Sequence, residues 1–79
     1  MSAIDEILDL LEDGKWHGIK EAMVKSDLQE FKVEMIYGFL AEYAFIDFNK
    51  EQQKAKLTPV TLEFLREIRR INKKSALNS

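Results

Sequence analysis

His17 is the only histidine of the 79 residues, and its side chain is the one that titrates near neutral pH. Catalysis or metal binding by an imidazole needs a partner, such as a serine or cysteine nucleophile or further metal ligands. The chain has no cysteine, and no such group of residues surrounds His17 in the sequence. Its carboxylates are spread as surface residues of predicted helices, and no glycine-rich phosphate loop is present. We therefore expect a structural or exposed His17 in a protein that is not an enzyme and has no metal, no cofactor and no evident small-molecule site.

The composition also limits where the protein acts and how it folds. The absence of cysteine excludes disulfides and is compatible with a reducing cytoplasm. No basic N-terminal region precedes an apolar run, and no apolar segment reaches the ~18 residues of a membrane helix, so we expect neither a signal peptide nor a membrane contact. Residues 1–74 are expected to form one small domain and residues 75–79 a frayed tail. Because so small a core is marginal, association as a homodimer is favoured.

The centre of the chain predicts two helices joined by a short turn. In the second helix, apolar residues recur at i, i+3, i+4 and i+7, which places them on one face: Val33, Ile36, Tyr37 and Leu40. The short join Ser26-Asp27-Leu28 is what a helix-turn-helix requires. Asp27, with Glu30 three residues later, predicts a capping box that starts this helix at about Leu28, and Gln29 is the alternative cap.

The flanking segments predict two more helices and a hairpin. A helical apolar pattern from Ile4 ends at Gly14, which can adopt the left-handed conformation. Residues 45–48 and 54–57 alternate in part like strands around a polar turn, and Pro59 suits the first turn of a last helix. Trp16 lies in a short strand-like segment and is expected to anchor one core with Ile36, Leu40 and Ile46.

Several of these segments resemble winged helix-turn-helix regulators. The resemblance rests on LQEFKVEMIYGFLAEYAFI at 28–46, on Trp16-His17-Gly18-Ile19-Lys20-Glu21 before the first motif helix, and on Leu57-Thr58-Pro59 after the wing, and it covers roughly residues 4–71. It implies a mainly α fold with a small β wing, in the order helix, short strand, helix, helix, strand, wing, strand, helix. Small proteins of this family, many of them archaeal, are mostly DNA-binding transcription regulators, so the resemblance implies double-stranded DNA as a partner.

Charge is distributed unevenly along the chain. Residues 1–49 carry 11 acidic and 4 basic side chains, a net −7, whereas residues 50–79 carry 3 acidic and 8 basic side chains, a net +5. A basic segment of this kind is found in nucleic-acid contacts and also in solvated, lysine-rich helix ends. If DNA is bound, we expect weak, salt-sensitive contacts with phosphates. The candidate residues are Gln29, Lys32, Lys50, Lys54, Lys56, Arg69 and Arg70.

The outward face of the second motif helix favours a protein contact over base recognition. This face carries Phe31, Met35, Gly38 and Phe39 and, instead of arginine or lysine, the carboxylates of its glutamates. Exposed phenylalanine and methionine are typical of interfaces, and one reason to keep a mid-helix glycine is the close approach of another backbone. A different explanation is that the first helix or the tail covers Phe31 or Phe39. A protein-interaction or homodimerisation module is thus the alternative function, with Phe31, Met35, Gly38, Phe39, Phe64, Ile68 and Ile71 as candidate interface residues.

Overall fold

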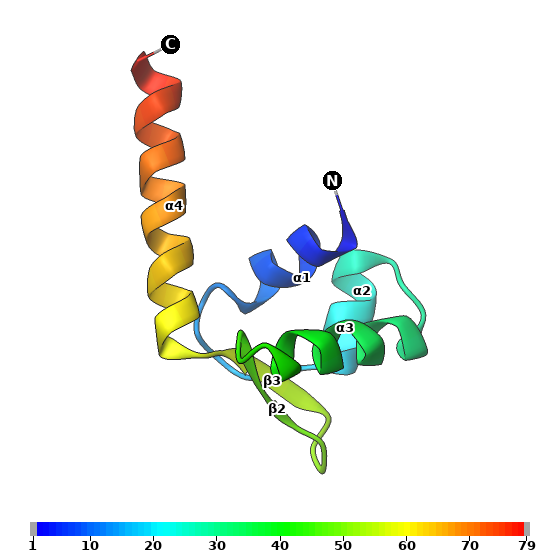
Figure 1. Cartoon of the computed structure of the whole chain (residues 1–79). Coiled ribbons are helices and arrows are strands. Elements are labelled where there is room, and N and C mark those ends of the chain that lie inside the picture. The colour runs from blue at the N-terminus through cyan, green and yellow to red at the C-terminus, as the bar shows by residue number, and fades with distance from the viewer. Residues whose placement is uncertain (1, 79) are drawn as a thin grey trace.

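The computed structural model describes the backbone of residues 2–78 and the side chains of residues 2–72. It is a small α/β domain with four helices and a three-stranded antiparallel sheet (Figure 1). The elements follow the predicted order, a layout compatible with a winged helix. They are α1 (Ala3–Leu11), β1 (His17–Gly18), α2 (Ile19–Ser26), α3 (Glu30–Glu42), β2 (Ile46–Asn49), β3 (Lys54–Leu57) and α4 (Pro59–Asn78).

The sheet places β3 between the other two strands, in the order β1-β3-β2. His17 is opposite Ala55 in the β1–β3 pair, and Ile46 is opposite Leu57 in the β2–β3 pair. Side chains alternate across a strand, so Ala55 and Leu57 of β3 point to one face while Lys56 points to the other. Both Ala55 and Leu57 are buried, which identifies the face that packs on the helices.

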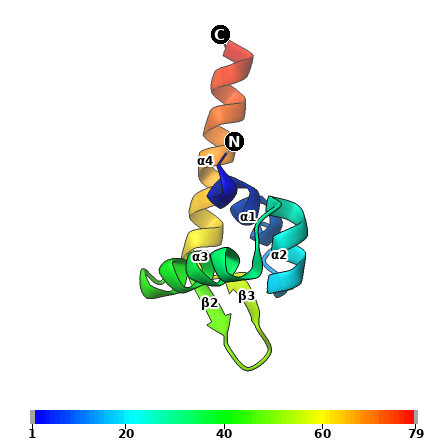
Figure 2. The same ribbon diagram turned by 90° about the vertical axis from the view of Figure 1, so that its right-hand side faces the viewer.

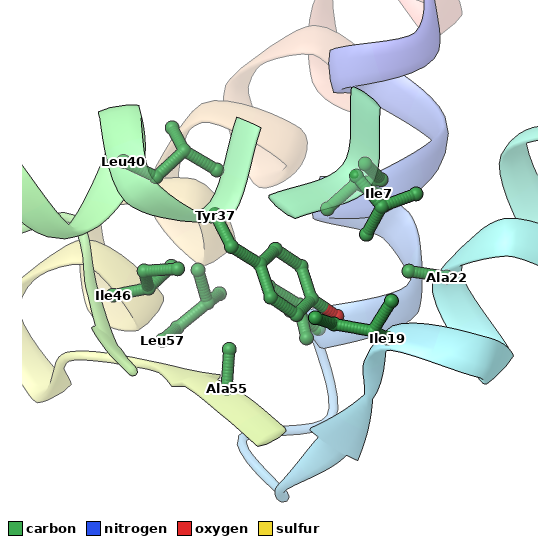
Figure 3. Close-up of a cluster of buried hydrophobic side chains, with 10 residues drawn as sticks. Ile7, Ile19, Ala22, Tyr37, Leu40, Ile46, Ala55 and Leu57 are labelled. Carbon is green, nitrogen blue, oxygen red and sulfur yellow. The ribbon is translucent and has the colours of Figure 1, made fainter. Parts of the chain in front are cut away.

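The hydrophobic core lies between the inner face of this sheet and helices α1, α2 and α3 (Figure 3). Full burial of a large apolar side chain contributes roughly 1.5–3 kcal/mol of transfer free energy, so these residues dominate the stability of the fold. Tyr37 lies near the middle of the cluster, with its ring among side chains from α2 and the sheet. The buried residues are Ile7, Leu11, Ile19, Ala22, Val33, Tyr37, Leu40, Ile46, Ala55 and Leu57.

Trp16 is not part of this core, contrary to the sequence-based expectation. Its side chain is 43% exposed, and the ammonium of Lys56 lies 4.8 Å from its ring centroid. The reason is strand alternation, because Trp16 precedes His17 and therefore faces the outer side of the sheet with Lys56. Leu40 and Ile46 are buried as predicted, and Ile36 is partly buried against the same cluster.

The start of α3 also differs from the predicted capping box. Asp27 has φ 56° and ψ 41°, a left-handed conformation, and its backbone N–H donates to the carbonyl of Met23. It therefore ends α2, and a residue in this conformation does not cap the next helix because an N-cap needs extended backbone. The alternative cap, Gln29, has that conformation, with φ −72° and ψ 158°, but its side chain makes no capping hydrogen bond. α3 consequently begins at Glu30.

α4 extends away from the rest of the molecule. In two perpendicular views its C-terminal half and the β2–β3 hairpin project in opposite directions from the body formed by α1, α2 and α3 (Figures 1 and 2). The longest dimension of the molecule is 44 Å, against 25 and 18 Å for the other two. The frayed tail expected at residues 75–79 stays a prediction, because those side chains and Ser79 lie outside the described residues.

Two glycines should respond oppositely to alanine. Gly14 has φ +77°, and a Cβ there would lie 2.9 Å from Leu62 Cδ2, so Gly14→Ala should lower the free energy of unfolding by about 1–2 kcal/mol. Gly38 lies inside α3, and a Cβ there would have no atom within 4 Å, so Gly38→Ala should raise stability by up to about 1 kcal/mol. Urea unfolding of the two variants measures both effects. Equal destabilisation by both substitutions would contradict the assigned conformations.

Candidate nucleic-acid and protein interfaces

The β2–β3 hairpin carries Lys50 and Lys54 at its exposed tip. Its turn is held by local hydrogen bonds: the backbone N–H of Gln52 donates to Asn49 Oδ1 at 3.0 Å, and the amide of Gln53 donates to the carbonyl of Lys50 at 2.7 Å. The backbone of Gln53 also accepts the N–H of Ile19 at 3.0 Å. This last bond fixes the hairpin to the start of α2, so the two lysines project from a supported strand pair.

The other predicted cationic residues differ in their exposure and in whether they already form an ion pair. Arg69 forms ion pairs with Asp9 of α1 and with Glu12, the residue that caps the end of α1, and Arg70 forms one with Glu67 at 2.8 Å. The hydrogen bond and charge of Arg70 lower the pKa of Glu67, and Glu67 in turn raises that of Arg70. Lys56 is only partly exposed, over Trp16. Of the predicted cations, Lys32, Lys50 and Lys54 are exposed and form no ion pair within the described part of the chain, and Lys15, Lys20 and Arg66 share both properties.

The outward face of α3 is uncovered in the monomer. Phe31 is 55% exposed, Met35 68% and Phe39 51%, so the side chains described for α1 and α4 do not cover them. Phe31 and Met35 border a shallow apolar depression between α3 and the start of α1, with Lys32 at its edge. Gly38 has open space beside it. The structure thus places four predicted interface residues on one exposed face, where Phe39 keeps a ring contact with Tyr43 at 5.0 Å.

A second apolar surface lies between α1 and α4 and includes the predicted interface residues Phe39 and Phe64, although the sequence did not predict that they would line a common groove. It is an open groove of about 430 Å³ whose walls are Ile4 and Leu8 of α1 and the first two turns of α4. The C-terminal end of α3 and Phe45 form its floor. Thr61 is the only lining residue with a polar side chain. The groove arises because α4 leaves the sheet beside α1 but does not pack along its length.

His17 is held between two carboxylates. Its Nε2 lies 2.9 Å from Asp13 Oδ1 and its Nδ1 lies 2.8 Å from Glu21 Oε2. Burial alone would lower the pKa of His17, but the hydrogen bonds and charges of Glu21 and Asp13 together raise it above 6.5. The pKa of Asp13 is lowered, mainly by the hydrogen bond from the backbone N–H of Lys15 and secondly by that with His17. The hydrogen bond with His17 also lowers the pKa of Glu21. The cluster joins the loop after α1 to the start of α2, which is a structural role.

The chain matches no model of a protein family, no curated protein and no solved structure. Among residues 2–78, no helix combines the length and apolar composition needed to cross a membrane. The same residues contain no group of three or more histidine or acidic side chains placed to hold a metal ion. The exposed lysines, the face of α3 and the groove are therefore the features of this chain that bear on its function.

The His17 cluster should give the protein a characteristic pH dependence. The pKa of His17 is raised in the folded protein. Its contribution to the free energy of unfolding is therefore fully present below the unfolded pKa of about 6.5 and is lost as the pH rises through the pKa of the folded protein. The lowered pKa values of Asp13 and Glu21 have the opposite effect, giving stability that is lost as the pH falls through their folded values. The cluster should therefore stabilise the fold most between roughly pH 4.5 and 6.5.

Urea unfolding of the wild type and of His17→Gln at about pH 5.5 and about pH 8.5 tests this dependence. The wild type should lose stability relative to the variant on going to the higher pH, by up to about 1 kcal/mol because Asp13 and Glu21 are largely exposed. If the difference between the two proteins is the same at both pH values, the ion-paired cluster does not contribute to stability.

Proposed function

We propose that this chain is a winged-helix protein that binds double-stranded DNA through its phosphate backbone, as a non-enzymatic, regulator-type factor. The observation that carries the proposal is the supported hairpin with Lys50 and Lys54 exposed at its tip. Gln29 and Lys32 lie exposed at the start of α3, the helix that follows the short turn after α2. Lysines without carboxylate partners can neutralise phosphates of DNA and release the counterions bound there. This release of counterions is the main source of sequence-independent affinity.

Low sequence specificity follows from the chemistry of α3. Its exposed face carries Phe31 and Met35, which offer no hydrogen bonds to base edges, and Glu34 and Glu42, which repel phosphates. Base recognition usually depends on arginine, lysine, asparagine or glutamine, and of the residues on α3 and its cap only Gln29 and Lys32 are of these types. The contact is therefore made mainly by the hairpin and is weakened by salt.

The double variant Lys50→Gln/Lys54→Gln tests this function. It should lower affinity for duplex DNA about equally across sequences and reduce the slope of log affinity against log salt by about 0.9 for each lost phosphate contact, measured by fluorescence anisotropy. The matched control is Lys25→Gln/Arg70→Gln, which removes two cations already near Glu6 and Glu67. Unchanged affinity in the first variant, or an equal loss in the control, would contradict a contact led by the hairpin.

A second candidate is a protein-interaction module that uses the outward face of α3. The observation that favours it is the exposure of Phe31, Met35 and Phe39 on one helix. Large apolar residues gathered in this way are characteristic of binding sites for other proteins.

Met35→Lys distinguishes the two candidates. Met35 is 68% exposed, so the substitution should leave the fold intact while adding a cation to the middle of α3. If α3 lies against DNA, the variant should bind duplex DNA more tightly, with a salt slope steeper by about 0.9. An unchanged affinity and slope would mean that this face is turned away from DNA and would favour the interaction module.

A further inference from the structure

The groove and the projecting part of α4 share one apolar face. Val60 and Phe64 line the groove within the first two turns of the helix. Ile68 and Ile71 follow Phe64 at i+4 and i+7, which continues the same face beyond the groove. Phe64 remains 62% exposed and Ile71 55% exposed, so the described residues of the monomer cover neither end of this face.

We propose that this face and the groove bind α4 of a second copy of the chain in antiparallel orientation. In a parallel pair, the α1–α3 bodies would meet at the same end of the two helices, because each body lies beside the N-terminal half of its α4 (Figures 1 and 2). An antiparallel pair places the bodies at opposite ends. Each projecting C-terminal half then lies along the partner's groove, and both apolar faces are covered by one two-fold contact.

Charge supports a second copy as the occupant. The residues of α1 (Ala3–Leu11) that line the groove are apolar, but the helix as a whole carries three carboxylates and no basic residue. From Arg69 to Asn78 the sequence of α4 has four basic residues and no acidic one. An antiparallel partner brings this basic segment to the acidic helix α1, and the two-fold axis makes the arrangement reciprocal. Within one chain Arg69 already pairs with Asp9, and Lys25 lies near Glu6, so among the described residues Asp5 is the carboxylate of α1 that a partner's cation would meet unpaired.

The exposed apolar area is also of the right order for a dimer. A phenylalanine side chain can bury ~150–250 Å², and Phe39, Phe45 and Phe64 are each about half exposed around the groove. Together with Val60, Ile71 and the other exposed aliphatic groups, they offer roughly 500–600 Å² per copy before polar groups are counted, against ~800 Å² per partner in a standard interface.

Ile71→Glu tests the proposal. Placing a carboxylate in a buried helix contact should raise the dimer dissociation constant by about 100-fold, measured by sedimentation equilibrium of the full chain. The matched control is Arg66→Glu, which introduces the same side chain at an exposed position on the opposite side of α4 and should leave the dissociation constant nearly unchanged. Circular dichroism of both variants should match that of the wild type, since Ile71 lies outside the core.

Single cysteines test the orientation, because the chain has none of its own. In an antiparallel pair centred on the apolar face, two Ile68→Cys residues lie within ~6 Å of each other along the axis, whereas two Val60→Cys residues are ~18 Å or more apart. A short bis-maleimide reagent, which tolerates a wider separation than a disulfide, should therefore cross-link Ile68→Cys and not Val60→Cys. Cross-linking of both variants would indicate a parallel pair and overturn the proposed geometry.

A wild-type chain that remains monomeric at millimolar concentration, or a dimer unaffected by Ile71→Glu, would overturn the proposal. The result is separable from DNA binding, because Lys50 and Lys54 lie on the hairpin, which projects away from α4. The two contacts are distinguished if Lys50→Gln/Lys54→Gln loses DNA affinity but still dimerises. They are also distinguished if Ile71→Glu loses the dimer but still binds DNA.

Discussion

The burial of Tyr37 is the interaction on which the other elements depend. Its side chain is fully buried and contacts Phe48 of β2 edge to face, with ring centroids 5.5 Å apart. Its hydroxyl donates to the carbonyl of His17 at 3.4 Å, so a single residue of α3 connects to both outer strands. Burial, and then the charge of Glu21, raise the pKa of Tyr37 to about 12, which keeps the hydroxyl protonated as a donor.

This central contact explains why the hairpin and the helix-turn-helix form one rigid unit. α3 cannot shift without moving the ring of Tyr37 away from the strands. β1 cannot separate from β3 without exposing the carbonyl of His17 and the adjoining ion pairs. The exposed lysines of the hairpin are consequently held at a fixed position relative to α3. A surface that contacts DNA mainly by charge benefits from such rigidity, because less conformational entropy is lost on binding.

α4 is attached to this unit in a different way. Leu62 and Leu65 pack partly against the core, and Arg69 pairs with carboxylates of α1, but the helix contributes no fully buried residue among those described. Ion pairs with exposed partners are weak, typically below about 1 kcal/mol each. Its apolar face therefore stays in water unless another molecule covers it. The body of the domain and α4 thus have separate physical roles, one in forming the core and the other in presenting an apolar helix.

The conflict between the proposed DNA contact and the apolar outer face of α3 follows from two independent requirements. The fold needs only the inner face of α3 to be apolar, and Val33, Tyr37 and Leu40 meet that requirement. Nothing in the packing of the monomer requires Phe31, Met35 or Phe39 to be apolar, since they are exposed. Side chains of this kind on the outer face are the reason for proposing a protein contact there. They also make base-specific recognition by this helix chemically unfavourable.

The sequence alone determined the features that depend on local spacing and conformation. Apolar periodicity placed Val33, Tyr37 and Leu40 on the inner face of α3, and alternation around a polar turn identified the hairpin. The left-handed end after α1 followed from Gly14, because few other residues adopt that conformation without strain. Exposure of Phe31 and Met35 also followed from helical geometry. All of these features involve residues a few positions apart. For such residues, the geometry of a helix or strand alone fixes the direction in which each side chain points.

Only the tertiary structure decided the contacts between distant segments. The position of Trp16 depends on which face of β1 packs inward, and the pairing of Arg69 with Asp9 joins residues 60 positions apart. Asp27 and Gln29 are both good candidates for a cap, and the path of the chain between α2 and α3 selects one of them. The groove exists because α4 diverges from α1, an angle set by the end of β3 and by the packing of Leu62 near Gly14. Such arrangements depend on packing across the whole domain. They cannot be predicted from the spacing of residues within one segment.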